Sequence, residues 1–237
     1  MIRKIDNALL QLPPSWMSRI VAGNRPLGTN QEIRKLLGEP IPQVADLDEV
    51  PPEVAAMFGR TGVLERIRRK LAVLSRKRGR AIVPAKNTIA AVDEEDNLYV
   101  GVEFLQACQG EEAVIAGILS HEWGHLVSDL PRGVDWSHLT WEELFALRRD
   151  EEANADAYAG RAMFRMGYAI EPVAQFFGRL EQKPARHPSP KYYATPVRIA
   201  ILRQAYAAEQ RVGNDARKLF PEAQFRHPST SQLLSVG

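Results

Sequence analysis

Residues 111–128 read EEAVIAGILSHEWGHLVS, an apolar stretch that ends in two histidines four positions apart. Val114 and Ile118 precede His121 and His125 at helical spacing, so the histidines continue one apolar face. Residues four apart differ by about 40° around a helix axis, which places both imidazoles on one side, a turn apart. The stretch therefore predicts a buried helix over 111–128 that presents two imidazoles to a common point.

Two imidazoles in this arrangement can bind one Zn²⁺ at about 2.0–2.1 Å each. Glu122 follows His121 directly, so its carboxylate is expected beside the ion, where it could take a proton from a zinc-bound water and return it to a leaving amine. The alternative is structural, with paired histidines that only satisfy neighbouring polar groups. The spacing favours zinc, with His121 and His125 as ligands and Glu122 as the general base.

A catalytic zinc needs a third protein ligand and one position left for water. A third histidine six positions after His125, following a glycine, is excluded because Pro131 and Ser128 stand at those positions. A second predicted helix offers Glu152 as the ligand instead. Asp156 lies four positions later on the same face, where we expect it to orient an imidazole through a hydrogen bond.

Small residues surround Glu152 in the second predicted helix, so the backbone of that helix can approach the first helix closely. They are Ala153, Ala155, Ala157, Ala159, Gly160 and Ala162. Taken alone, an acidic helical segment is usually a solvated face. The rival third ligands that the sequence leaves open are Glu142, Glu143, Glu151 and His138.

Periodicity along the whole chain predicts an α+β protein that is mostly α, with one small sheet. We expect helices over 30–37, 51–78, 141–167, 171–182 and 194–212, and strands over 88–92 and 98–102 around the acidic turn 93–97. The expected division is an N-terminal helical or irregular region with a regulatory or docking role (1–80), a catalytic domain (81–212) and a C-terminal tail (213–237).

Composition narrows the functional classes. The 237 residues are 45% apolar and 25% charged, as in ordinary soluble globular proteins, and the net charge of +2 does not by itself indicate nucleic-acid binding. No uncharged stretch approaches the roughly 20 residues of a membrane-spanning helix, and the N-terminus lacks a signal-peptide pattern. The single cysteine, Cys108, favours a reducing compartment and is expected to be a small buried thiol. We therefore expect a soluble cytoplasmic protein.

The segment 66–80 is strongly basic. Its cations are Arg66, Arg68, Arg69, Lys70, Arg76, Lys77, Arg78 and Arg80. A solvated helix face is the simpler interpretation. A docking surface for nucleic acid, an anionic lipid or an acidic partner is the alternative.

Several motifs around the two histidines also match a known family. A strand-like segment (98–102) precedes the His-Glu-x-x-His helix, a Glu-x-x-Ala-Asp element follows at 152–156, and residues 166–172 read MGYAIEP. A later His-Pro element starts at His187, ahead of a helix containing arginine. In these features residues 87–202 resemble the catalytic core of the HtpX and CAAX-prenyl-protease-like zinc metallopeptidases, a gluzincin family.

The resemblance implies a zincin-like core with a small sheet edge and two long active-site helices. It implies a zinc metalloendopeptidase with one Zn²⁺ per chain, acting on protein or peptide substrates. Arg198 corresponds to a support residue of the family's site. The match of His187 is less close, because either five residues are inserted before Arg198 or Thr195-Pro196 replaces the His-Pro element. Without the membrane helices of many relatives, we expect no prenylated or membrane-embedded substrate.

An open edge at the strand 98–102 would let an extended substrate pair with it and continue past the site, which favours an endopeptidase. One rival is an ImmA/IrrE-type regulatory peptidase, in which residues 151–154 match in a shifted register, although Gly167-Tyr168 argues against it. The other is a non-catalytic, zinc-stabilised interaction module that docks through the basic segment. Glu122 argues against that module, because a purely structural zinc site has no use for it.

Overall fold

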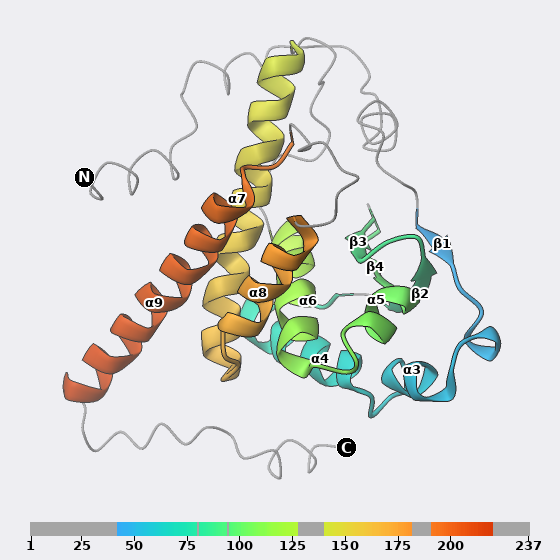
Figure 1. The fold of residues 1–237 in the computed structure, drawn as a ribbon. Helices are drawn as coiled ribbons and strands as arrows, with labels where there is room; N and C mark the ends of the chain where they lie inside the picture. The colour runs from blue at the N-terminus through green and yellow to red at the C-terminus, as the bar shows by residue number, and fades with distance from the viewer. Residues whose placement is uncertain (1–41, 80, 94, 128–139, 182–190, 220–237) are drawn as a thin grey trace.

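The computed structural model describes residues 42–79, 81–93, 95–127, 140–181 and 191–219 (Figure 1). Within these ranges the chain forms seven α-helices and a four-stranded mixed sheet, so the predicted class of mostly helical α+β is confirmed. The elements in chain order are β1 (Gln43–Val44), the 3-10 turn η1 (Leu47–Glu49), α3 (Pro52–Met57), α4 (Val63–Ser75), β2 (Ile82–Lys86), β3 (Ala90–Val92), β4 (Leu98–Gly101), α5 (Val102–Ala107), α6 (Glu112–Val127), α7 (Trp141–Met166), α8 (Glu171–Glu181) and α9 (Thr195–Leu219).

Helix α6 lies at the centre of the molecule, with the sheet and α5 on one side and α7, α8 and α9 on the other (Figure 1). It is apolar on nearly all sides, and a helix of that kind is stable only when other elements cover it all round. Helix α7 begins at a capping box between Thr140 and Glu143 and ends at Gly167, whose φ of 81° suits glycine. The two long helices predicted over 111–128 and 141–167 are thus confirmed.

The sheet has the strand order β1-β2-β4-β3. Strands β2 and β4 are parallel, while β1 and β3 run antiparallel to their neighbours. The predicted hairpin is confirmed as β3 and β4, and the Asp93 side chain accepts hydrogen bonds from the backbone N–H groups of Glu95 and Asn97 in the turn. The open edge expected at 98–102 is wrong, because β4 is paired on both sides and β3 is the end strand.

Other boundaries also differ from the predictions. The single helix over 51–78 is wrong: α3 and α4 are separated by a turn, in which a Cβ on Gly62 would lie 2.2 Å from the carbonyl oxygen of Met57. Helix α9 continues past the expected end at residue 212 to Leu219. The helix predicted over 30–37 lies outside the described residues.

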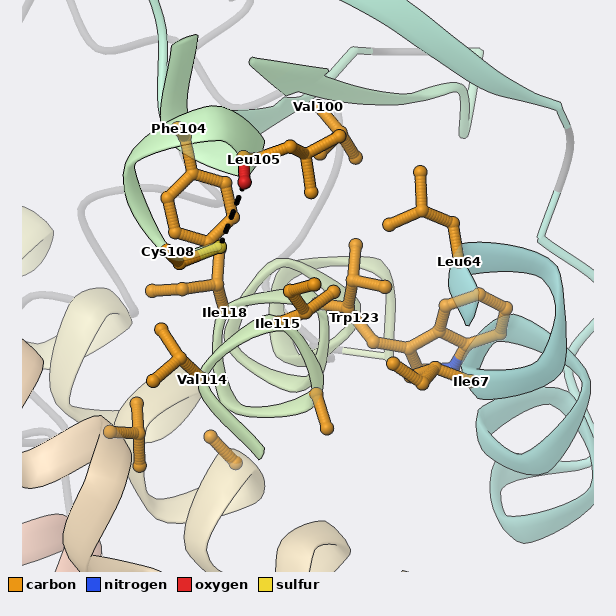
Figure 2. Packing of buried hydrophobic residues seen from close by; sticks show 14 of the residues in the cluster. Leu64, Ile67, Val100, Phe104, Leu105, Cys108, Val114, Ile115, Ile118 and Trp123 are labelled. Carbon is orange, nitrogen blue, oxygen red and sulfur yellow. Dashed lines mark hydrogen bonds between the residues drawn. The ribbon is translucent and has the colours of Figure 1, made fainter. Parts of the chain in front are cut away.

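The main hydrophobic cluster includes α4 as well as α6, so it extends across residue 80. Leu64, Ile67 and Leu71 of α4 are fully buried, and Figure 2 shows the first two beside Trp123 of α6. The indole N–H of Trp123 donates a 2.9 Å hydrogen bond to Ser75 Oγ at the end of α4. Helix α4 is therefore part of the support of α6.

Cys108 lies in the same cluster, at the end of α5. Its thiol faces the carbonyl oxygen of Leu105 at 3.5 Å (Figure 2), and burial raises its pKa. This position agrees with the predicted small buried thiol. No helix in the described part of the chain is both long enough and apolar enough to cross a membrane.

The packing of α4 gives a stability prediction. Leu71 is fully buried, so Leu71→Ala should lower the free energy of unfolding by about 2–5 kcal/mol, through lost apolar burial and a cavity. The matched control, Val73→Ala on the same helix, removes a side chain that is 71% exposed and should change it by less than about 0.5 kcal/mol. Urea unfolding of both variants measures the difference. An equal change in the free energy of unfolding for the two variants would contradict a core that includes α4.

Candidate metal centre

The two histidines of α6 face Glu152 of α7. His121 Nε2 lies 3.3 Å from His125 Nε2 and 3.1 Å from Glu152 Oε2, and His125 Nε2 lies 3.9 Å from the same oxygen. A tetrahedral ion with bonds of about 2.0–2.1 Å holds its ligands about 3.3 Å apart. These three atoms therefore have the spacing to hold one metal ion, and they form such a group within the described residues.

The buried carboxylate of Glu152 needs a cation. Glu152 is only 9% exposed, and its Oε2 lies 3.1 Å from His121 Nε2 and 3.9 Å from His125 Nε2. A buried carboxylate is costly unless a positive charge balances it, because it has lost its hydration. A metal ion between this oxygen and the two Nε2 atoms would supply that charge, so the residues present fit such an ion.

The other nitrogen of His121 contacts Asp156, as predicted for a residue that orients an imidazole. His121 Nδ1 lies 2.8 Å from Asp156 Oδ1, and the Asp156 side chain is fully buried. Arg198 of α9 donates two hydrogen bonds to that carboxylate, at 2.7 and 2.9 Å. Its guanidinium also lies 4.8 and 4.7 Å from the rings of Phe177 and Tyr192. Arg198 thus neutralises the charge of Asp156 and fixes its position, and Asp156 in turn contacts the imidazole of His121.

The second imidazole has a carboxylate of its own. His125 Nδ1 lies 3.5 Å from Glu151 Oε1, and the other oxygen of Glu151 pairs with Arg148. The sequence offered Glu151 only as a rival third ligand. In the structure it lies on the Nδ1 side of His125, away from the group formed by the Nε2 atoms and Glu152.

The remaining candidates divide between the surface and the undescribed segments. Glu142 is exposed in the first turn of α7, and Glu143 belongs to the capping box of that helix. His138 and His187 lie outside the described residues. Glu122 is half-buried beside His121 and is not part of the ligand group.

The convergence of these side chains depends on a close contact between α6 and α7. A Cβ on Gly124 would lie 2.7 Å from the Cα of Ala155, so the two backbones approach more closely than most side chains allow. The small residues predicted to keep α7 slim include this alanine. Because the backbones meet at Gly124, carboxylates of α7 can reach both His125, the next residue, and His121, about one turn earlier on α6.

The paired charges of the site shift the pKa values of His121, Glu152 and Asp156. Burial alone lowers the pKa of His121, but the adjacent Asp156 and Glu152 carboxylates outweigh it and raise that pKa to about 10. Burial raises the pKa of both carboxylates, and the imidazoles and Arg198 outweigh it, so both end below their usual values. These pairings favour the charged forms of His121, Glu152 and Asp156 together.

The helix contact gives a prediction for Gly124→Ala. The added methyl must push α6 and α7 apart, so the free energy of unfolding should fall by about 1–3 kcal/mol and the affinity for zinc should fall with it. Gly178→Ala on α8 is the control, because its methyl meets no atom within 4 Å and should stabilise by about 0.5–1 kcal/mol. Denaturant unfolding and zinc titration measure both; unchanged zinc affinity in Gly124→Ala would contradict the role of the contact.

The raised pKa of His121 predicts a proton release on metal binding. Below pH 10 the metal-free imidazole keeps its proton, whereas a metal ligand must be neutral. Zinc binding at pH 7 should therefore release at least one proton, and the apparent affinity should fall about tenfold for each unit of decreasing pH. Calorimetry in two buffers of different ionisation enthalpy counts the protons. Binding without proton release would show that His121 is neutral beforehand.

Comparisons with known proteins found no match to this chain. No protein-family model, curated protein sequence or solved structure matches the chain. The family likeness of its motifs therefore remains an interpretation of those motifs. What the site can do is inferred from the geometry of His121, His125 and Glu152 and the groups around them.

Proposed function

We propose that this protein is a zinc-dependent metalloendopeptidase with a zincin-like core that hydrolyses peptide bonds in protein or peptide substrates. The proposal depends on one observation, the convergence of His121, His125 and Glu152 from two helices on a common point. Glu122, directly beside the first of these ligands, adds the base that hydrolysis needs. The same residues carry the likeness to the HtpX and CAAX-prenyl-protease-like gluzincins.

Zinc is the metal that this donor set favours. Two imidazole nitrogens and one carboxylate oxygen are ligands that Zn²⁺ accepts in catalytic sites, where three protein ligands leave a position open. When bound by His121, His125 and Glu152, zinc would supply Lewis-acid polarisation of the scissile carbonyl and would lower the pKa of a water molecule.

The carboxylate of Glu122 performs the proton transfers in this proposal. It accepts a proton from the attacking water as the water oxygen bonds to the scissile carbonyl carbon, and it delivers that proton to the departing amine nitrogen as the C–N bond breaks. Asp156 contacts the Nδ1 side of His121 and is itself held by Arg198. Together they orient the ring so that its Nε2 remains directed at Glu152.

The end strand β3 is the proposed position of the substrate backbone. It packs against α6, the helix that carries Glu122, and within the described residues no strand pairs with its outer edge. An extended peptide can add to such an edge through main-chain hydrogen bonds. A peptide held in this way continues past the site in both directions, which supports endopeptidase activity.

The two rival interpretations have less support. The register of an ImmA/IrrE-type peptidase uses Glu151 and Asn154. Glu151, however, lies on the Nδ1 side of His125, away from the ligand group, and Asn154 is exposed. An interaction module that docks through the basic segment would need free cations. In α4, Arg68 and Arg69 both pair with Glu65, which neutralises part of the charge.

The base is tested by Glu122→Gln. This variant should bind zinc as the wild type does, because residue 122 is not among the ligands, and should lose about 10²–10⁴-fold in the rate of casein cleavage. The control Glu103→Gln removes an exposed carboxylate on α5 and should leave the rate unchanged. A chelator should abolish cleavage by the wild type. Wild-type turnover by Glu122→Gln would refute the assigned base.

A further inference from the structure

Two carboxylates of α7 lie behind the imidazoles, one for each ring. Asp156 is within 2.8 Å of His121 Nδ1, and Glu151 is 3.5 Å from His125 Nδ1. Both rings direct the opposite nitrogen, Nε2, toward Glu152. Each imidazole is thus placed between a carboxylate at Nδ1 and the ligand group at Nε2.

Arg148 fixes the position of Glu151. Its guanidinium pairs with Glu151 Oε2 from one turn earlier on α7, while Oε1 of the same carboxylate faces His125. The side chains of Glu151 and Arg148 are 17% and 18% exposed, so water screens their charges only in part. The arrangement repeats the one behind His121, where Arg198 holds Asp156.

We infer that Glu151, held by Arg148, is a positioning residue that orients His125 toward the metal. This inference rests on the proposed zinc site and adds residues to it. A carboxylate at Nδ1 selects the tautomer with the proton on that nitrogen, which leaves the lone pair on Nε2 for the metal, and it increases the basicity of the ring. Glu151 acts through His125 and is not itself a ligand.

The test measures zinc affinity of the full chain by competition with a chromophoric chelator. Loss of such an outer carboxylate weakens metal binding by about 10–100-fold. Because the contact with His125 is long, we expect about tenfold for Glu151→Gln and more for Glu151→Ala. Arg148→Met should weaken binding less than Glu151→Gln, since it frees the carboxylate but leaves it in place.

The control is Glu142→Gln, which removes the same charge from the exposed first turn of α7, about 15 Å along the helix axis from Glu152. It should bind zinc as tightly as the wild type. Equal affinities for Glu151→Gln, Arg148→Met and the wild type would overturn the positioning role and leave the zinc site standing. Failure of the wild type to bind zinc would overturn the proposed function and this inference together.

The visible spectrum of the Co²⁺-substituted protein separates positioning from ligation. If Glu151 acts only through His125, Glu151→Gln should keep the strong absorption of four-coordinate Co²⁺, with a small shift of the bands. A collapse to the weak absorption of higher coordination would show that Glu151 is a ligand and would overturn the inference. Should Glu151→Gln fail to fold, Arg148→Met decides the question by the same two readouts.

Discussion

The site depends on the contact between the backbones of α6 and α7 at Gly124 and Ala155. At this separation a glutamate side chain on α7 spans the distance to two imidazoles on α6, and a side chain at Gly124 would push the helices apart. The contact is possible because both helices are buried along this face and carry small residues there. Packing between two helices thus determines where the polar atoms meet.

Charge balance is the second constraint on this arrangement. The site contains three carboxylates of α7, of which Glu152 and Asp156 are buried and Glu151 is partly buried. Two of them have an arginine each: Asp156 has Arg198 and Glu151 has Arg148. Glu152 instead faces the two imidazoles, with its Oε2 3.1 Å from His121 Nε2 and 3.9 Å from His125 Nε2. Buried carboxylates require a counter-charge. A protonated His121 or a bound divalent cation would supply that counter-charge to Glu152.

Much of the site could be predicted from local sequence. The spacing of His121 and His125 and the Glu-x-x-Ala-Asp element beginning at Glu152 depend only on helical periodicity, which sequence shows directly. Helical periodicity likewise gave the limits of α7 to within one residue, 141–167 against the observed Trp141–Met166. Asp156 was predicted to orient an imidazole for the same reason, since it lies one turn after Glu152 on the same face of the helix.

The features that were missed depend on contacts between distant segments. The break between α3 and α4 follows from the approach of Gly62 to the Met57 carbonyl, and β2 contains Pro84, which argues against a strand when read alone. The central place of β4 arises from its pairing with β2, which no local pattern reveals. The position of Glu151 behind His125 required the crossing geometry of α6 and α7, because neighbours on a helix point about 100° apart.

Zinc K-edge X-ray absorption of the full chain would identify the ligands of the metal. We expect one zinc per chain, bound by two imidazole nitrogens and by oxygen donors at about 2.0–2.1 Å, with one imidazole lost in His125→Ala. A chain that binds no stoichiometric zinc, or a spectrum with sulfur ligation or no imidazole, would contradict a metal centre at His121, His125 and Glu152.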